Sequence, residues 1–96
     1  MNIQHHSGDT KGEFYIERNG DTAAKITYTK LGSTQVIVDH MEVSDDVEGQ
    51  SIGRKLVEQI VNYARKHELK LIPLCPFVKS IIERDESLQD VLKRRR

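Results

Sequence analysis

The residues best suited to chemistry include a histidine, a carboxylate and a thiol. His40 and Glu42 are two positions apart, which places both side chains on one face of an extended strand. An imidazole beside a carboxylate can accept a proton from an amine, although such a histidine can also be purely structural. Cys75 is the only cysteine of the chain and precedes Pro76, a residue that suits the first turn of a helix. The helix dipole would stabilise a Cys75 thiolate, and the alternative is a buried structural thiol.

A second group of residues could bind an anion, because it opens a helical pattern with two glycines and a serine. Backbone N–H groups at a helix start lack carbonyl partners and lie at the positive end of the helix dipole, so such a turn can hold a phosphate. The same turn can also be an ordinary helix start that Ser51 caps. The residues concerned are Glu48, Gly49, Gln50, Ser51, Ile52 and Gly53, followed by Arg54 and Lys55.

Strands are expected on the N-terminal side of this turn. Alternation with a period of two predicts strands over residues 14–18, 23–31 and 34–43, joined by turns at Asn19-Gly20 and Gly32-Ser33. The last of these is expected to be central, since both of its faces carry apolar groups: Ile37, Met41 and Val43 on one, and Val36, Val38 and His40 on the other. Residues 1–12 predict a loosely ordered start, in which 2–5 could pair as an edge strand.

Helices and one more strand are expected after the turn. Apolar residues recur at steps of three and four over 51–67, which predicts an amphipathic helix. Residues 69–74 predict a short strand whose second half leaves the sheet, because Pro73 has no amide hydrogen. A helix follows over 76–84, with Phe77, Val78, Ile81 and Ile82 as its apolar stripe, and a last turn or two over 88–92. The strands 34–43 and 69–74 should be neighbours, because the helix between them makes a crossover. This order predicts one small α/β (α+β) domain with a mixed, mainly antiparallel sheet, a long central helix and a C-terminal helix.

Composition limits the functions that this chain can have. At 96 residues it is expected to form a single domain. Fifteen Lys and Arg balance fifteen Asp and Glu, so no overall field attracts nucleic acid or an anionic membrane. The basic end at 93–96 is expected to be a solvated tail. His5, His6 and His67 lack the spacing of metal ligands, and we expect no metal site. No long apolar stretch and no signal peptide are evident, and one unpaired cysteine fits a reducing compartment, so we expect a soluble, cytoplasmic monomer.

The pattern Val-x5-Gly-x3-Gly-x2-Leu, from Val43 to Leu56, follows a strand and opens a helix. With residues 40–43 before it and 72–79 after it, this arrangement resembles the acyl-CoA-binding core of the GCN5-related N-acetyltransferases, in particular their minimal YjdJ-type subgroup, over residues 13–92. The family hallmark is Gln or Arg, two residues, Gly, one residue, then Gly or Ala. Aligning Gly53 with its last position places Ser51 at the first glycine and Glu48 at the Gln or Arg, so two of the three defining positions differ.

The resemblance implies acetyl-CoA or coenzyme A as the cofactor. Backbone groups of the strand around Met41 and Val43 would hold the pantetheine arm, and amides of 50–54 would hold the diphosphate. The Glu48 carboxylate would repel that diphosphate unless it turns to solvent or pairs with a base. The acyl group would lie between two diverging strands, beside Cys75.

The implied activity is acetyl transfer to an unidentified amine, on a small molecule or a protein lysine. Family members often use a tyrosine of the last helix as the acid, and residues 76–84 contain none. Cys75 could replace it, either as the acid or by accepting the acyl group transiently, and His40 with Glu42 could act as the base. The alternatives are a CoA-binding module with little or no turnover, and an interaction domain that uses the basic C-terminal tail.

Overall fold

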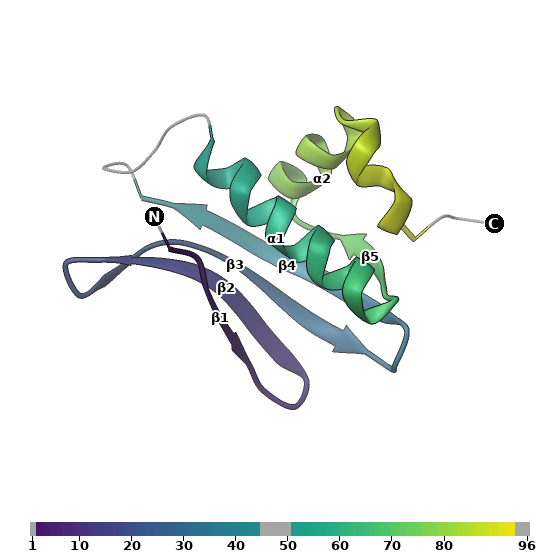
Figure 1. Ribbon diagram of the computed structural model, residues 1–96, viewed down its shortest axis with the longest axis horizontal. Coiled ribbons are helices and arrows are strands. Elements are labelled where there is room, and N and C mark those ends of the chain that lie inside the picture. Colours follow the sequence, from purple (N-terminus) through teal and green to yellow (C-terminus); the bar gives the residue numbers. More distant parts are fainter. Residues whose placement is uncertain (1, 45–50, 94–96) are drawn as a thin grey trace.

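The computed structural model describes residues 2–44 and 51–93, which form a five-stranded sheet with helices on one face (Figure 1). The strands follow chain order across the sheet; the first four pair antiparallel, and the fifth pairs parallel to the fourth. This confirms the predicted mixed sheet with a long central helix. The elements are β1 (Gln4–Ser7), β2 (Lys11–Arg18), β3 (Asp21–Leu31), β4 (Gln35–Val43), α1 (Ile52–His67), β5 (Lys70–Pro73), α2 (Pro76–Glu83) and the 3-10 helix η2 (Glu86–Val91).

The tight turns form where glycine and asparagine were expected to allow them. Asn19 and Gly20 both have positive φ, 57° and 85°, which a two-residue hairpin turn of this hand requires. Gly32 has a φ of 65° in the next turn. The edge strand expected at 2–5 lies at Gln4–Ser7 and pairs with β2, so the start of the chain belongs to the sheet instead of being loose.

One extra residue in β4 changes which side chains face the helices. Thr27 of β3 pairs with His40 and Tyr28 pairs with Val38, which leaves Asp39 as a β-bulge. Val36 and Val38 are buried before the bulge, and Met41 and Val43 pack against the same core after it. The prediction that Met41 and Val43 lie opposite Val36 and Val38 is therefore wrong, because strict alternation does not continue across a bulge.

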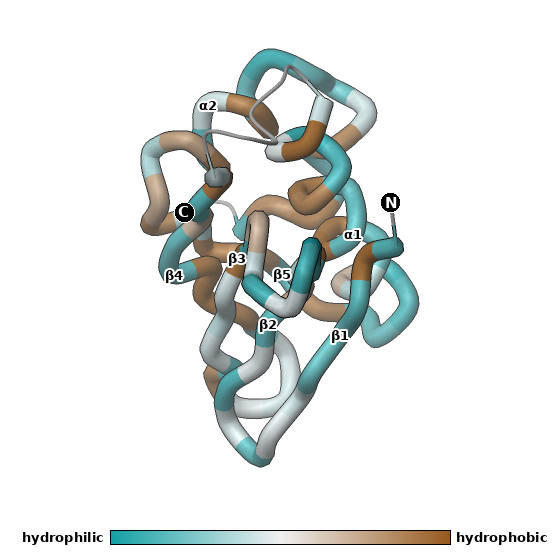
Figure 2. Tube along the Cα trace, turned by 90° about the vertical axis from the view of Figure 1, so that its left-hand side faces the viewer, coloured by the Kyte–Doolittle hydropathy of each residue, from teal (hydrophilic) through white to brown (hydrophobic). Residues whose placement is uncertain are grey.

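The core lies between the sheet and the helices. Hydrophobic stretches gather where these layers meet, and the turn at the bottom of the view is hydrophilic (Figure 2). Val78 and Ile82 of α2 are fully buried, but Phe77 is 69% exposed, so it does not belong to the predicted apolar stripe. Leu74, three residues before it, is 64% exposed. None of the helices in the described residues is long and apolar enough to cross a membrane. The helix residues of the core are Ile52, Leu56, Val57, Ile60, Val61 and Ala64 from α1, Val78 and Ile82 from α2, and Leu88 and Val91 from η2.

A cluster of rings joins β1 to the rest of the domain. The His5 ring stacks on Phe14 with centroids 4.1 Å apart, and its Nε2 atom lies 2.6 Å from the Tyr28 hydroxyl. Tyr63 of α1 packs against all three rings. Burial raises the pKa of Tyr28 to about 12 and, together with the nearby Lys30, lowers the pKa of His5. Both groups are therefore held in their neutral forms, which suits a partly buried hydrogen bond.

Candidate active site

β4 and β5 separate part-way along their length. Their pairing runs from Gln35 with Lys70 to Val38 with Pro73, and the last hydrogen bond joins the Leu74 N–H to the Val38 carbonyl at 3.0 Å. Beyond this bond β4 continues to Val43 while the chain after β5 turns into α2 (Figure 1). We call the space between residues 39–43 and the start of α2 the wedge. On this side, β4 beyond Val38 has no ladder partner among the described residues, so its N–H and C=O groups can bind a ligand.

Helix α1 begins at the same end of the sheet at which β4 ends (Figure 1). Ser51 precedes the helix with φ of −109°, a conformation that a residue other than glycine adopts without strain. Its side chain makes no capping hydrogen bond, so the capping role suggested for Ser51 is not observed. The N–H groups of Ile52 and Gly53 open the helix, and its first turn carries no acidic residue. Glu48, Gly49 and Gln50 lie outside the described residues.

Arg54 is engaged by two carboxylates. Its Nε donates to Glu58 at 2.9 Å, one turn along α1, and its Nη2 donates to Asp85, the residue that caps η2. The hydrogen bonds that the guanidinium donates to Asp85 and then to Glu58 raise its pKa. Contact between Arg54 and a cofactor diphosphate would thus require an exchange of ion-pair partners. The neighbouring Lys55 is exposed, and its side chain can reach an anion at the helix start without such an exchange.

Asp85 links α1 to η2 and is expected to make stability depend on pH. Hydrogen bonds from Ser87 and Arg54 lower the pKa of Asp85 from 3.8 to about 2. Since the folded state binds this proton more weakly than the unfolded state, the stabilisation is complete above about pH 4 and is lost as the pH falls toward about 2. We expect Asp85→Asn to flatten the dependence of the melting temperature on pH in this window. Glu86→Gln, at an exposed neighbour, should leave the slope as it is, and an equal slope in both variants would contradict the role of Asp85.

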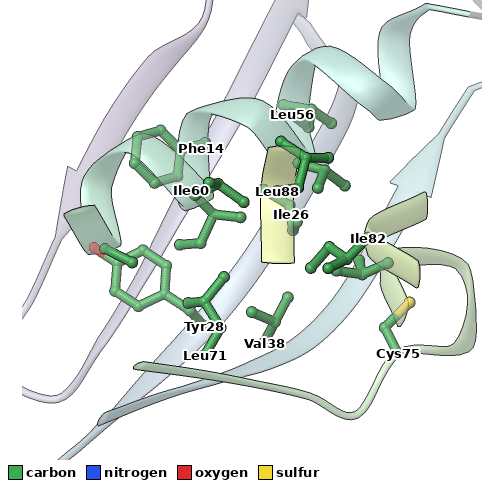
Figure 3. Packing of buried hydrophobic residues seen from close by; sticks show 14 of the residues in the cluster. Phe14, Ile26, Tyr28, Val38, Leu56, Ile60, Leu71, Cys75, Ile82 and Leu88 are labelled. Atoms are coloured by element: carbon green, nitrogen blue, oxygen red, sulfur yellow. The ribbon is translucent and has the colours of Figure 1, made fainter. Parts of the chain in front are cut away.

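The candidate chemical groups lie on two sides of the wedge. His40 Nε2 is 3.1 Å from Glu42 Oε2, and both side chains are more than half exposed. They pair across the sheet with Thr27 and Lys25, on the face that the helices leave open. Cys75 is only 4% exposed and packs into the core on the helix side, next to Ile82 (Figure 3). The predicted His40–Glu42 pair is therefore present, and Cys75 approaches the wedge from the opposite face.

Residues 13–91 match the family model described as GCN5-related N-acetyl-transferase. The chain belongs to the GCN5-related N-acetyltransferase family. The solution structure of a GCN5-like protein from Staphylococcus aureus is similar over almost its whole length: it is 34% identical, with a TM-score of 0.72, and the match covers 99% of this chain and 92% of that one. The family and the fold that the sequence predicted are confirmed.

Larger family members share the fold at lower identity. The ribosomal-protein-alanine N-acetyltransferase of Brucella melitensis is 18% identical with a TM-score of 0.65, covering 80% of this chain and 64% of that one. A GNAT family acetyltransferase from Elizabethkingia anophelis with acetyl-CoA bound is 11% identical with a TM-score of 0.62, covering 75% and 63%. The match thus spans less than two thirds of either larger protein. Comparison with curated protein sequences gave no match.

The close contact of Gly53 with Met41 and Ile81, beside the wedge, was not predicted from the sequence of this GCN5-related N-acetyltransferase family member. A Cβ atom on Gly53 would lie 3.2 Å from Met41 Cε and 3.9 Å from Ile81 Cδ1. Gly53 therefore lets β4, α1 and α2 approach closely beside the wedge. The available signal was a glycine inside a helix, which costs about 1 kcal/mol relative to alanine and so indicates a close contact. Within residues 2–44 and 51–93, no three His, Cys, Asp or Glu side chains gather as metal ligands.

Proposed function

We propose that this protein transfers an acetyl group from acetyl-CoA to an amine. The observation that carries the proposal is the wedge, where unpaired backbone of β4 runs toward the start of α1, whose first N–H groups have no carbonyl partner within the helix. The amide groups of a pantetheine arm can hydrogen-bond to the backbone of β4 around Met41 and Val43. The N–H groups of Ile52, Gly53 and Arg54 then meet the diphosphate, assisted by the Lys55 ammonium. A family member with acetyl-CoA bound supports this choice of cosubstrate.

In the proposed reaction, the base acts on the open face of the wedge and Cys75 acts on its helix side. The acceptor amine approaches from the open face, where Glu42 orients the His40 ring and the other ring nitrogen accepts the amine proton. The amine nitrogen then attacks the thioester carbonyl, whose developing negative charge a backbone N–H of β4 stabilises. The carbon–sulfur bond breaks, and the departing thiolate takes a proton from Cys75 on the helix side. Alternatively, the Cys75 thiolate attacks the thioester carbonyl first, and CoA leaves as its thiolate, which takes a proton from solvent. The amine then attacks the acetyl-Cys75 thioester, and the Cys75 thiolate is the leaving group.

A CoA-binding module with little turnover is the second candidate. It is favoured by α2, which contains no tyrosine to act as the acid, and by the burial of Cys75 among apolar side chains. The third candidate, an interaction domain, depends on the basic tail, and residues 94–96 lie outside the described residues. We propose further that the protein acts as a cytoplasmic monomer on a small-molecule amine or a protein lysine, with no nucleic acid or membrane partner.

Titration with CoA and acetyl-CoA, followed through backbone amide NMR signals, tests cofactor binding. We expect shifts concentrated at Met41, Val43 and residues 52–55, with Lys55→Ala weakening binding about threefold because one exposed charge at a diphosphate contributes roughly 0.6 kcal/mol. Lys66→Ala, in the last turn of α1, is the matched control and should bind CoA as the wild type does. Signals of β4 and the α1 start that stay unchanged would contradict both CoA hypotheses. Release of CoA thiol in the presence of a panel of amines then separates an enzyme from a binding module.

A further inference from the structure

The bulge at Asp39 decides which side chain borders the wedge on its helix side. Asp39 accepts a hydrogen bond from Thr29 at 2.9 Å, and His40 pairs with Thr27, so both side chains lie on the open face. Met41 pairs with the buried Ile26 instead. Met41 is therefore the first side chain beyond Val38 that points toward the helices, at the place where β4 has left β5.

The tip of Met41 lies between the two helices. Its Cε and Sδ atoms are 3.2 and 3.7 Å from the position of a Cβ on Gly53, and Ile81 Cδ1 is 3.9 Å from the same point. At the start of α2, which borders the wedge, Cys75 is 4% exposed and Val78 is fully buried. The helix side of the wedge is thus closed by fixed core residues except at Met41, which is partly exposed and has an unbranched, flexible side chain.

We propose that Met41, held against Gly53 and Ile81, limits the length of the acyl group that the wedge accepts. This inference rests on the proposed function, which places the acyl thioester in the wedge. An acetyl group ends before the Met41 tip, whereas a longer chain extending to the helix side must displace that tip from its contacts. Since neighbouring core residues are close-packed, this displacement is unfavourable and grows with each added methylene.

Two substitutions should move this limit in opposite directions. Met41→Ala removes the tip and opens space for a longer chain. Gly53→Ala adds a methyl group against Met41 Cε, which pushes the tip further into the wedge, while alanine is a better helix former than glycine and so should not unfold α1. Met41→Leu keeps the volume and should keep the limit. Val43→Ala is the matched control, because Val43 faces the same core one step further along β4.

The test compares dissociation constants of CoA and of its S-ethyl, S-butyl and S-hexyl thioethers, which cannot transfer a group. We expect wild type and Met41→Leu to bind S-hexyl-CoA about 30-fold more weakly than S-ethyl-CoA, and Met41→Ala to reduce this ratio to about threefold. Gly53→Ala should already discriminate about tenfold between S-ethyl-CoA and S-butyl-CoA. Each dissociation constant is divided by that of unmodified CoA for the same protein, so that a change in the affinity for CoA itself does not enter the comparison.

The binding measurements test the role of Met41 and the proposed cofactor separately. If CoA binds but every thioether binds alike in wild type and Met41→Ala, Met41 does not limit the acyl group. An equal loss of discrimination in Val43→Ala would attribute the effect to general loosening of the core, and it too would overturn the inference. If neither CoA nor any thioether binds to the wild type, the proposed cofactor itself is wrong.

Discussion

Replacing Gly12 with alanine is expected to lower the free energy of unfolding by about 2–3 kcal/mol, the upper part of the range of about 1–3 kcal/mol that overpacking typically costs. The added Cβ atom would lie 2.3 Å from the hydroxyl oxygen of Tyr28 and 2.4 Å from its Cζ atom. Gly12 and Tyr28 are direct cross-strand partners on β2 and β3. Since β2 and β3 are paired at this position, neither backbone can move away from the clash without losing ladder hydrogen bonds.

Tyr28 cannot easily move away from this clash. Its side chain is fully buried, its hydroxyl is bonded to His5, and Phe14 and Tyr63 pack against its ring. Moving the ring would break the contacts that hold β1 and α1 together at this end of the sheet. Urea unfolding followed by circular dichroism measures the effect. Glu13→Ala, at the next position of β2 and on the other face, is the control and should change stability by less than about 0.5 kcal/mol. A Gly12→Ala protein as stable as the wild type would show that Tyr28 has room to move.

Local patterns were sufficient to predict most elements of this fold. The strands β2 and β3 and the helix α1 have largely regular apolar periods, as does β4 up to its bulge, because each element has one buried face. The bulge at Asp39 could not be predicted, because an extra residue in a strand changes the register without requiring a particular residue type. The exposure of Phe77 also escaped prediction, since a short helix at the edge of the core buries only part of an apolar stripe.

The candidate site was predictable in part. The resemblance to the family located the segment around residues 40–43 and Cys75, and the spacing of His40 and Glu42 placed them on one face. Cys75 lies on the opposite face from His40 and Glu42 because of the path that the chain takes after β5. No local sequence pattern predicts that path. The ion pair between Arg54 and Asp85 could not be predicted for a similar reason, because Asp85 lies 31 residues away in the sequence and contacts Arg54 only through tertiary folding.

Replacing Cys75 with alanine is expected to lower the rate of acetyl transfer about 100-fold, the lower end of what a positioned acid or nucleophile contributes. Cys75 lies directly before α2, with Pro76 as the first helical residue, and its side chain makes no capping hydrogen bond. The thiol is 4% exposed, and in the proposed reaction it meets the acyl thioester from the helix side of the wedge. CoA affinity should change by less than about twofold, because the contacts proposed for the cofactor involve backbone groups of β4 and α1.

Rate and mass measured together distinguish the two roles proposed for Cys75. If the thiol accepts the acetyl group, incubation with acetyl-CoA and no amine should add one acetyl group to the intact wild-type protein and none to Cys75→Ala. If it acts only as the acid, transfer slows in Cys75→Ala but the mass of the wild type stays unchanged. Phe77→Ala, two residues away and exposed, is the control for a general disturbance of α2. Unchanged turnover in Cys75→Ala, without any mass gain that depends on Cys75, would show that the thiol is structural. Its burial in the hydrophobic core would then account for its presence, and the departing thiolate would have to take its proton from water.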